Sequence, residues 1–231
     1  TSGPGEFYLG ANLGGASLVV TNSGTANLAH LAVGNTGNGL LSIDSGTVNV
    51  NGAWLISGYS AGGTGNIVLN GGALNTSGTT PLHLSYFGHG TLTVNDGTVT
   101  LGNALNVAVQ PGSQGDLVMN GGTVTAAALV FGHAGTQTLD LNGGQLITTG
   151  GFSEGANSTF YIGSGELIFN GGQSLEDVQG LVSGSNWIFD DTASVYDSGS
   201  GIVVTSIPEP ATLGLIAIFG GALIGVRRFR M

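Results

Sequence analysis

Leu92-Thr-Val94-Asn95-Asp-Gly97-Thr-Val99 is one copy of the eight-residue pattern that decides the fold. The pattern runs apolar, any, apolar, Asn or Asp, any, Gly, any, apolar. Clear copies span 41–48, 67–74, 92–99, 117–124 and 139–146, and looser ones surround Asn22 and Asn170. The successive Asn or Asp positions (22, 44, 70, 95, 120, 142 and 170) are 22, 26, 25, 25, 22 and 28 residues apart. Units of this length cannot bury an apolar face alone, so they must stack on one another as a repeat protein.

Each repeat contains three short strands joined by corners. In the central repeat, two alternating apolar stretches lie on either side of the Asn-Asp-Gly corner, and period-two alternation is typical of strands with one buried face. A third alternation follows at Leu105, Val107 and Val109, before Pro111-Gly112 closes the coil. We therefore predict an all-β fold, a parallel β-helix (solenoid) of about seven three-strand coils over residues 1–173. At about 4.8 Å per coil, seven coils form a rod of roughly 35 Å.

Two other repeat architectures fit this pattern less well. A β-propeller needs about 40 to 45 residues per blade, and leucine-rich repeats show a different leucine spacing and a helical side. Residues 174–206 depart from the period. A short helix is predicted from Ser174, strands are predicted at Trp187–Phe189 and around Ile202–Thr205, and the segment is expected to cap the open end of the solenoid.

The charge of the body limits its partners. Of the 13 acidic residues 12 precede residue 207, whereas all three basic residues follow it. Nucleic-acid binding depends on Lys and Arg that neutralise phosphates, so we expect no nucleic-acid partner. An anionic body also disfavours direct attraction to acidic polysaccharides or anionic lipids. There is no Cys, which excludes disulfides and thiol chemistry.

The repeated Asn or Asp is the most regular polar feature. Stacked side-chain oxygens can bind calcium, or stacked amides can form a ladder that satisfies the corners. Calcium sites rely on carboxylates, whereas most members here are neutral, so we predict a structural ladder with neither metal nor cofactor. Its predicted members are Asn70, Asn95, Asn120, Asn142 and Asn170.

Catalysis is weakly supported, and we predict no catalytic residues. A glycosidase needs two carboxyl groups about 5 to 9.5 Å apart. The adjacent pairs Asp190-Asp191 and Glu176-Asp177 both lie in the predicted cap, and neighbours on a strand point to opposite faces. A glycan-active enzyme that uses these carboxylates stays an alternative.

A few rings and imidazoles suggest binding instead. Tyr59, Tyr86 and Tyr161 can form a sugar-stacking stripe. His89 and His133 follow a recurring Phe-Gly pair, and we interpret them as solvated turn residues rather than as ligands of one metal ion.

The last 25 residues differ from the body. Pro208-Glu209-Pro210 precedes a 16-residue apolar run, Ala211–Val226, and then Arg227, Arg228 and Arg230. As a helix the run is roughly 24 Å long, slightly short for a bilayer core of about 30 Å. The alternative is a buried C-terminal helix, but the run is apolar on all faces, which suits lipid better. Arginines directly after an apolar span hold the charged end in the cytoplasm.

This order of elements resembles the PEP-CTERM sorting signal of exported bacterial proteins, and residues 207–231 are its counterpart here. The resemblance implies recognition by an exosortase-type membrane protease near Pro208-Glu209-Pro210, with the membrane helix acting as a temporary inner-membrane anchor. It also implies an N-terminal export signal and bacteria that make exopolysaccharide, which is then a candidate partner. The body is similar in texture to autotransporter-associated β-strand repeats.

Together these features predict a non-catalytic structural or adhesive protein. Its expected location is the cell envelope, the outer surface or the extracellular matrix. The alternative is a carbohydrate-binding or glycan-active β-helix protein.

Overall fold

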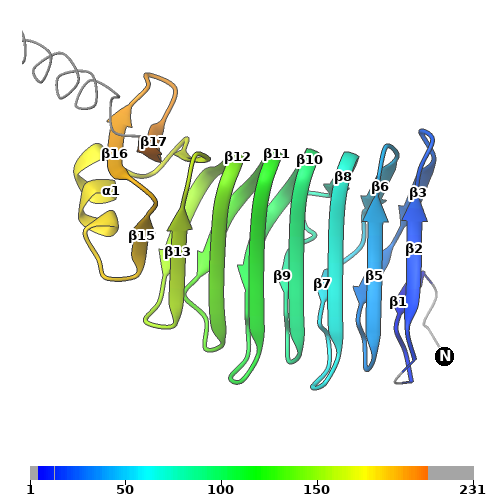
Figure 1. Ribbon diagram of the computed structural model, residues 1–231. Coiled ribbons are helices and arrows are strands. Elements are labelled where there is room, and N and C mark those ends of the chain that lie inside the picture. Colours follow the sequence, from blue (N-terminus) through cyan, green and yellow to red (C-terminus); the bar gives the residue numbers. More distant parts are fainter. Residues whose placement is uncertain (1–4, 13, 208–231) are drawn as a thin grey trace, which may run out of the picture.

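The computed structural model describes residues 5–12 and 14–207, which form a β-solenoid of about eight turns with one short helix. Figure 1 shows the turns side by side, with the N-terminal turn at one end and the helix at the other. The elements in chain order are β1 (Glu6–Leu9), β2 (Ala16–Val20), β3 (Thr25–Leu28), β4 (His30–Val33), β5 (Asn38–Ile43), β6 (Thr47–Val50), β7 (Leu55–Ser57), β8 (Thr64–Thr76), β9 (Leu82–Leu84), β10 (His89–Val107), β11 (Gln114–Phe131), β12 (Thr136–Glu154), β13 (Ser158–Ile162), β14 (Glu166–Phe169), α1 (Leu175–Val182), β15 (Trp187–Phe189), β16 (Thr192–Asp197) and β17 (Ile202–Ile207).

Most turns contribute one strand to each of three parallel sheets. The first sheet contains β2, β5, the starts of β8, β10, β11 and β12, then β13 and β15. Its central inward-facing column consists of Leu18, Leu41, Ile67, Leu92, Leu117, Leu139, Phe160 and Trp187. The second sheet contains β3, β6, the later parts of β8, β10, β11 and β12, and then β14. The third sheet contains β1, β4, β7, β9 and the ends of β10, β11 and β12. The prediction of a parallel solenoid is confirmed. The turn number is about eight rather than seven, because β13 and β15 continue the first sheet beyond the last clear copy of the repeat.

The core lies inside the coil and is made of the alternating apolar residues of the three sheets. Leu92, Leu105 and most of their equivalents are fully buried, while Leu18 and Phe152 are partly buried against this core. At the corner after the first sheet the backbone needs a left-handed residue, and Gly72 supplies it with a φ of +72°. A side chain there would meet the carbonyl of Gly46 on the preceding turn, so the Gly of the repeat is required for stacking as well as for the bend.

The third strand does not keep the predicted alternation to its end. Leu105 and Val107 are buried, but Ala108 is also buried, and Val109 is only half-buried. Ala108 has a φ of +50°, so the chain turns at this residue and the next side chain no longer points inward. The predicted inward position of Val109 is therefore wrong.

Residues beyond 173 cover one end of the solenoid. Helix α1 begins with a capping box, in which Ser174 and Asp177 satisfy each other's backbone N–H groups. Trp187 stacks on Phe160 of the previous turn, with ring centroids 4.4 Å apart. Strand β17 runs antiparallel to both β14 and β16, which ends the parallel stacking.

The predicted membrane tail falls almost wholly outside the described residues. Ile207, which we placed in the tail, is the last residue of β17. Within 5–12 and 14–207 no helix is long and apolar enough to cross a membrane. The predicted sorting motif and arginines (Pro208, Glu209, Pro210, Arg227, Arg228 and Arg230) lie beyond that range.

Candidate ligand-binding surface

A continuous group of aromatic side chains lies on the outside of the third sheet and its following corner. We call it the aromatic strip: Tyr8, His30, Trp54, Tyr59, His83, Tyr86 and Phe87. Trp54 is its centre. Its ring lies 5.1 Å from that of His30 and 6.2 Å from that of Tyr59, and the planes of the latter pair differ by only 3°. Tyr59 continues to Tyr86 at 6.3 Å.

The strip exists because the third sheet presents apolar residues outward as well as inward. Tyr8, Ala32, Ile56 and His83 are successive register partners on strands β1, β4, β7 and β9. Ala32 and Ile56 alternate with inward residues and so face outward, yet they are only 0% and 5% exposed. A second layer of side chains must therefore cover them on the outside of the sheet. The rings of the strip lie at this place, so part of each ring is used for packing and part faces solvent.

A pocket of about 300 Å³ opens within the strip. Ile56 lies beneath it, and the rings of Trp54, Tyr59, His83 and Tyr86 line it together with Ala53. Apolar and aromatic walls with a few polar groups are typical of small-molecule sites.

His83 is the unusual member of the pocket lining. Its Nδ1 is buried and has no hydrogen-bond partner among the described residues. Burial lowers the pKa of His83, and the neighbouring His133 lowers it further. The imidazole is therefore neutral near pH 7 and offers the pocket a polar group without a charge.

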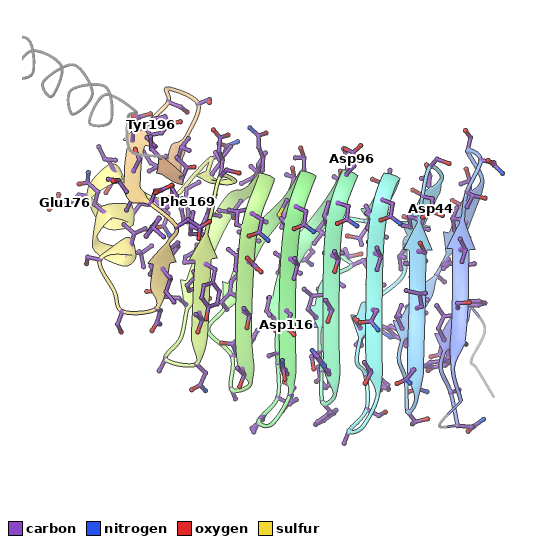
Figure 2. All side chains as sticks on the ribbon, viewed as in Figure 1. Asp44, Asp96, Asp116, Phe169, Glu176 and Tyr196 are labelled. Atoms are coloured by element: carbon purple, nitrogen blue, oxygen red, sulfur yellow. The ribbon has the colours of Figure 1, made fainter. Side chains whose placement is uncertain are left out.

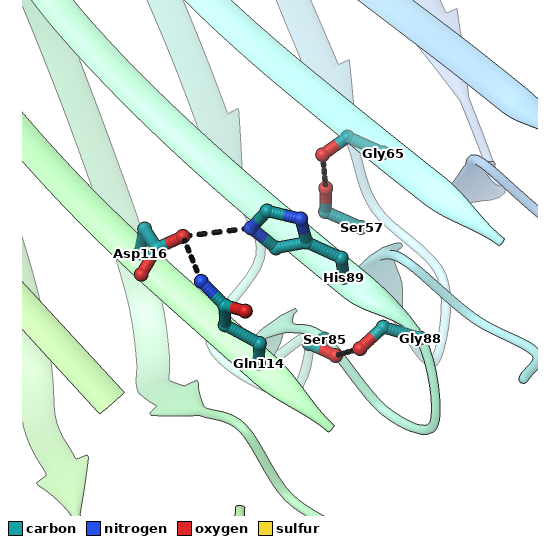
Figure 3. Close-up of polar contacts among 7 residues, drawn as sticks. All are labelled: Ser57, Gly65, Ser85, Gly88, His89, Gln114 and Asp116. Atoms are coloured by element: carbon teal, nitrogen blue, oxygen red, sulfur yellow. Dashed lines mark hydrogen bonds and ion pairs between the residues drawn. The ribbon is translucent and has the colours of Figure 1, made fainter. Parts of the chain in front are cut away.

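A second pocket, of about 240 Å³, lies at the corner that leads from the third sheet into the first. Its polar wall contains His89 and Gln114. His89 Nε2 lies 2.7 Å from Asp116 Oδ2, and Gln114 Nε2 donates to the same oxygen over 3.2 Å (Figure 3). The carboxylate of Asp116 therefore fixes the orientation of both side chains.

Two serines lie near this cluster in Figure 3 but do not face it. Ser57 and Ser85 are fully buried, and their hydroxyls donate to the carbonyl oxygens of Gly65 and Gly88. Among the described residues neither serine hydrogen-bonds to His89.

The predicted amide ladder is present over four of its five members. Each Nδ2 donates to the Oδ1 of the preceding turn: Asn95 to Asn70 over 2.8 Å, Asn120 to Asn95 over 2.8 Å and Asn142 to Asn120 over 3.2 Å. Asn70 in turn donates to Asp44 over 2.9 Å. A second, shorter ladder, Asn27–Asn49–Asn75, was not predicted; it lies within strands β3, β6 and β8.

Asn170 does not belong to the ladder, and its assignment was wrong. Phe169 pairs in register with Thr148, and the backbone N–H of Asn170 donates to the Thr148 carbonyl. Asn170 therefore lies one corner later in the coil than Asn142. The turn of the coil that follows Asn142 is shorter than most. Counting residues from Asn142 therefore leads past its equivalent position to the next corner.

The three tyrosines of the predicted sugar-stacking stripe do not all lie together. Tyr59 and Tyr86 are neighbours in the strip, but Tyr161 lies on β13, on the outer face of the first sheet, where its register partner is Asp140. Sequence reasoning missed Tyr8, His30, Trp54 and His83. His30 and Trp54 share a signal, since each stands immediately before the first buried Leu of a third-sheet strand.

The Phe-Gly-His triplets are not equivalent in the structure. Phe131 is fully buried whereas Phe87 is 49% exposed, and His89 pairs in register with Gln114, which pairs with Thr136 rather than with His133.

Carboxylates are dispersed over the described residues. Figure 2 shows Asp44, Asp96, Asp116 and Glu176 at separate places on the molecule. Asp177 is occupied at the start of α1, where hydrogen bonds from Ser174 lower the pKa of its carboxyl. In the part of the chain that the structure describes, no three His, Asp or Glu side chains gather closely enough to hold a metal ion.

The chain matches no protein-family model, no curated protein and no solved structure. The chemistry of the aromatic strip and of the corner pocket is therefore the basis for assigning a ligand.

Proposed function

We propose that this chain is a non-catalytic structural and adhesive protein of the bacterial cell envelope or extracellular matrix, and that the aromatic strip binds neutral polysaccharide. The observation that carries the proposal is the strip itself, with ring-to-ring contacts from Tyr8 to Phe87. It follows the long axis of the rod across successive turns, which suits a long polymer better than a single small molecule.

Aromatic rings bind sugars through their faces. The carbon–hydrogen face of a pyranose is apolar, while its hydroxyls point outward around the ring. Trp and Tyr combine a large apolar surface with one polar group, so they suit a ligand of this kind. The neutral imidazole of His83 can exchange a hydrogen bond with a hydroxyl inside the pocket.

Charge favours a neutral ligand over an acidic one. The body has 12 acidic residues before position 207 and no Lys or Arg there. A uronic-acid polymer would meet repulsion without any cationic partner, whereas a neutral glucan or similar polymer would meet none.

The sorting part of the proposal rests on the sequence of the tail. An exosortase-type protease would act near Pro208-Glu209-Pro210 and release the rod from a temporary inner-membrane anchor. The intact mass of the mature protein from the producing cells tests this step. A C-terminus near residues 207–210 supports it, and a mass that still includes Arg227, Arg228 and Arg230 contradicts it.

Retention on neutral polysaccharide tests the adhesive part. The full chain, held in a detergent without a sugar headgroup, is passed over an insoluble β-glucan and over alginate. Binding to the glucan alone is expected. Trp54→Ala is expected to weaken it roughly two- to twelvefold, because one aromatic contact contributes about 0.5–1.5 kcal/mol beyond its buried area. Tyr161→Ala is the matched control, since Tyr161 is 43% exposed but lies off the strip. Equal loss in both variants, or stronger retention on alginate, contradicts the proposal.

A further inference from the structure

The aromatic strip does not end on the third sheet. Tyr86 lines the pocket of the strip, whereas the next residue, Phe87, lines the corner pocket. The two rings meet edge to face with centroids 5.0 Å apart. The two pockets are therefore neighbours, separated by this pair of rings, and one apolar surface continues from the first into the second.

The corner pocket has a more polar wall than the first pocket. Asp116 holds His89 and Gln114 through one oxygen. Within the described residues, His89 Nδ1 and Gln114 Oε1 make no other hydrogen bond. These two groups are oriented by a fixed neighbour and remain available to a ligand.

The floor of the corner pocket is open. Gly62 and Gly112 line it, and a Cβ placed on either residue would meet no atom within 4 Å. Space of this kind beside an exposed ring, Phe87, and two oriented polar side chains is suited to a ring that carries hydroxyls. The pocket has no cationic side chain, so an anionic ligand would lack a partner.

The size of the pockets limits what each can hold. Their volumes, about 300 and 240 Å³, lie at or below the lower end of the roughly 300–1,000 Å³ typical for drug-sized ligands. Each therefore suits a single sugar ring rather than a whole oligosaccharide.

We propose that the corner pocket is a second subsite, and that the ligand is a neutral oligosaccharide of at least two pyranose rings that passes round the corner of the coil. One ring stacks in the pocket of the strip beside Trp54. The next ring contacts Phe87, donates a hydroxyl hydrogen bond to Gln114 Oε1 and exchanges another with His89 Nδ1. This inference rests on the proposed function and adds to it the direction of the bound polymer.

The test is the dependence of affinity on ligand length. Glucose and the cello- and laminari-oligosaccharides of two to six units are titrated calorimetrically into the full chain, in a detergent without a sugar headgroup. We expect the affinity to rise at least tenfold from one unit to the oligosaccharides and then to level off. Phe87→Ala and Gln114→Ala are expected to remove most of this rise. Both residues are exposed, so the fold should survive, which circular dichroism of each variant checks.

Two controls separate the possible failures. Thr136 is the register partner of Gln114 on the next turn and lies outside the pocket, so Thr136→Ala should leave all affinities unchanged. Trp54→Ala should weaken the binding of every ligand. If affinity does not depend on length, or if the rise persists in Phe87→Ala and Gln114→Ala, the second subsite is wrong although the adhesive function stands. If no oligosaccharide binds, both proposals fall.

Discussion

Removing the amide ladder should destabilise the solenoid by an amount that the hydrogen bonds predict. The triple substitution of Asn70, Asn95 and Asn120 by Ala breaks four bonds, from the one between Asn70 and Asp44 to the one between Asn142 and Asn120. All four are exposed, so each belongs at the lower end of the range for a net hydrogen bond, about 0.5 kcal/mol. None of the three residues has a positive φ, so alanine adds no backbone strain.

The expected loss is therefore about 2 kcal/mol, the product of four bonds and about 0.5 kcal/mol each. For a chain of this size, 1 kcal/mol corresponds to about 2–4 °C in Tm, which gives a fall of about 4–8 °C. Thermal unfolding of the full chain, followed by circular dichroism, measures it. Asn170→Ala is the control, because Asn170 is exposed and outside the ladder. A fall in the triple variant no larger than that of the control would refute the ladder as a source of stability.

Two further predictions concern packing and pH. Gly34→Ala should lower the free energy of unfolding by more than about 3 kcal/mol, because φ is +73° and the new Cβ would meet the carbonyl of Thr64. Gly62→Ala should lower it by only about 1–2 kcal/mol, because φ is +81° but no atom lies within 4 Å of the new Cβ. Urea unfolding measures both values. Equal costs would contradict the role of close stacking. Burial raises the pKa of Glu154, although the indole N–H of Trp187 partly opposes this. The pKa of the Glu154 carboxyl is therefore higher in the folded chain than in the unfolded chain. Wild-type stability thus falls as pH rises from the unfolded value through the folded value. Glu154→Gln keeps an acceptor for the indole N–H of Trp187. The Tm of this variant should exceed that of wild type by an amount that grows as pH rises from about 4 to about 7. A difference that shrinks as pH rises would mean that the pKa shift has the opposite sign.

The fold was predictable because its signals are local. Alternation within a strand and an Asn-Gly corner need only about ten residues to be recognised, and five clear copies repeat them. The predictions that were wrong depend on the register between neighbouring turns. Successive members of the first-sheet column between Leu18 and Trp187 are 21 to 27 residues apart, so equivalence cannot be assigned from spacing alone. Asn170 was placed at the wrong corner for this reason.

The aromatic strip was harder to find than the ladder for the same reason. The ladder joins residues at one position of a clear motif, whereas the strip joins Trp54 before a strand with Tyr59 after it and with Tyr86 on the next turn. Their proximity depends on where each corner turns the chain. Tyr161 differs from both tyrosines, since it lies within strand β13 and faces outward from a different sheet.

Hydrogen exchange with mass spectrometry tests the central claim, that neutral polysaccharide binds along the aromatic strip, most directly. The full chain is compared with and without a soluble β-glucan in the same detergent. The account predicts slower exchange in the segments that carry Trp54 to Tyr59 and Tyr86 to His89, and unchanged exchange around Tyr161. Protection confined to the Tyr161 face or to the cap, or no protection at a glucan concentration that saturates retention, would contradict it.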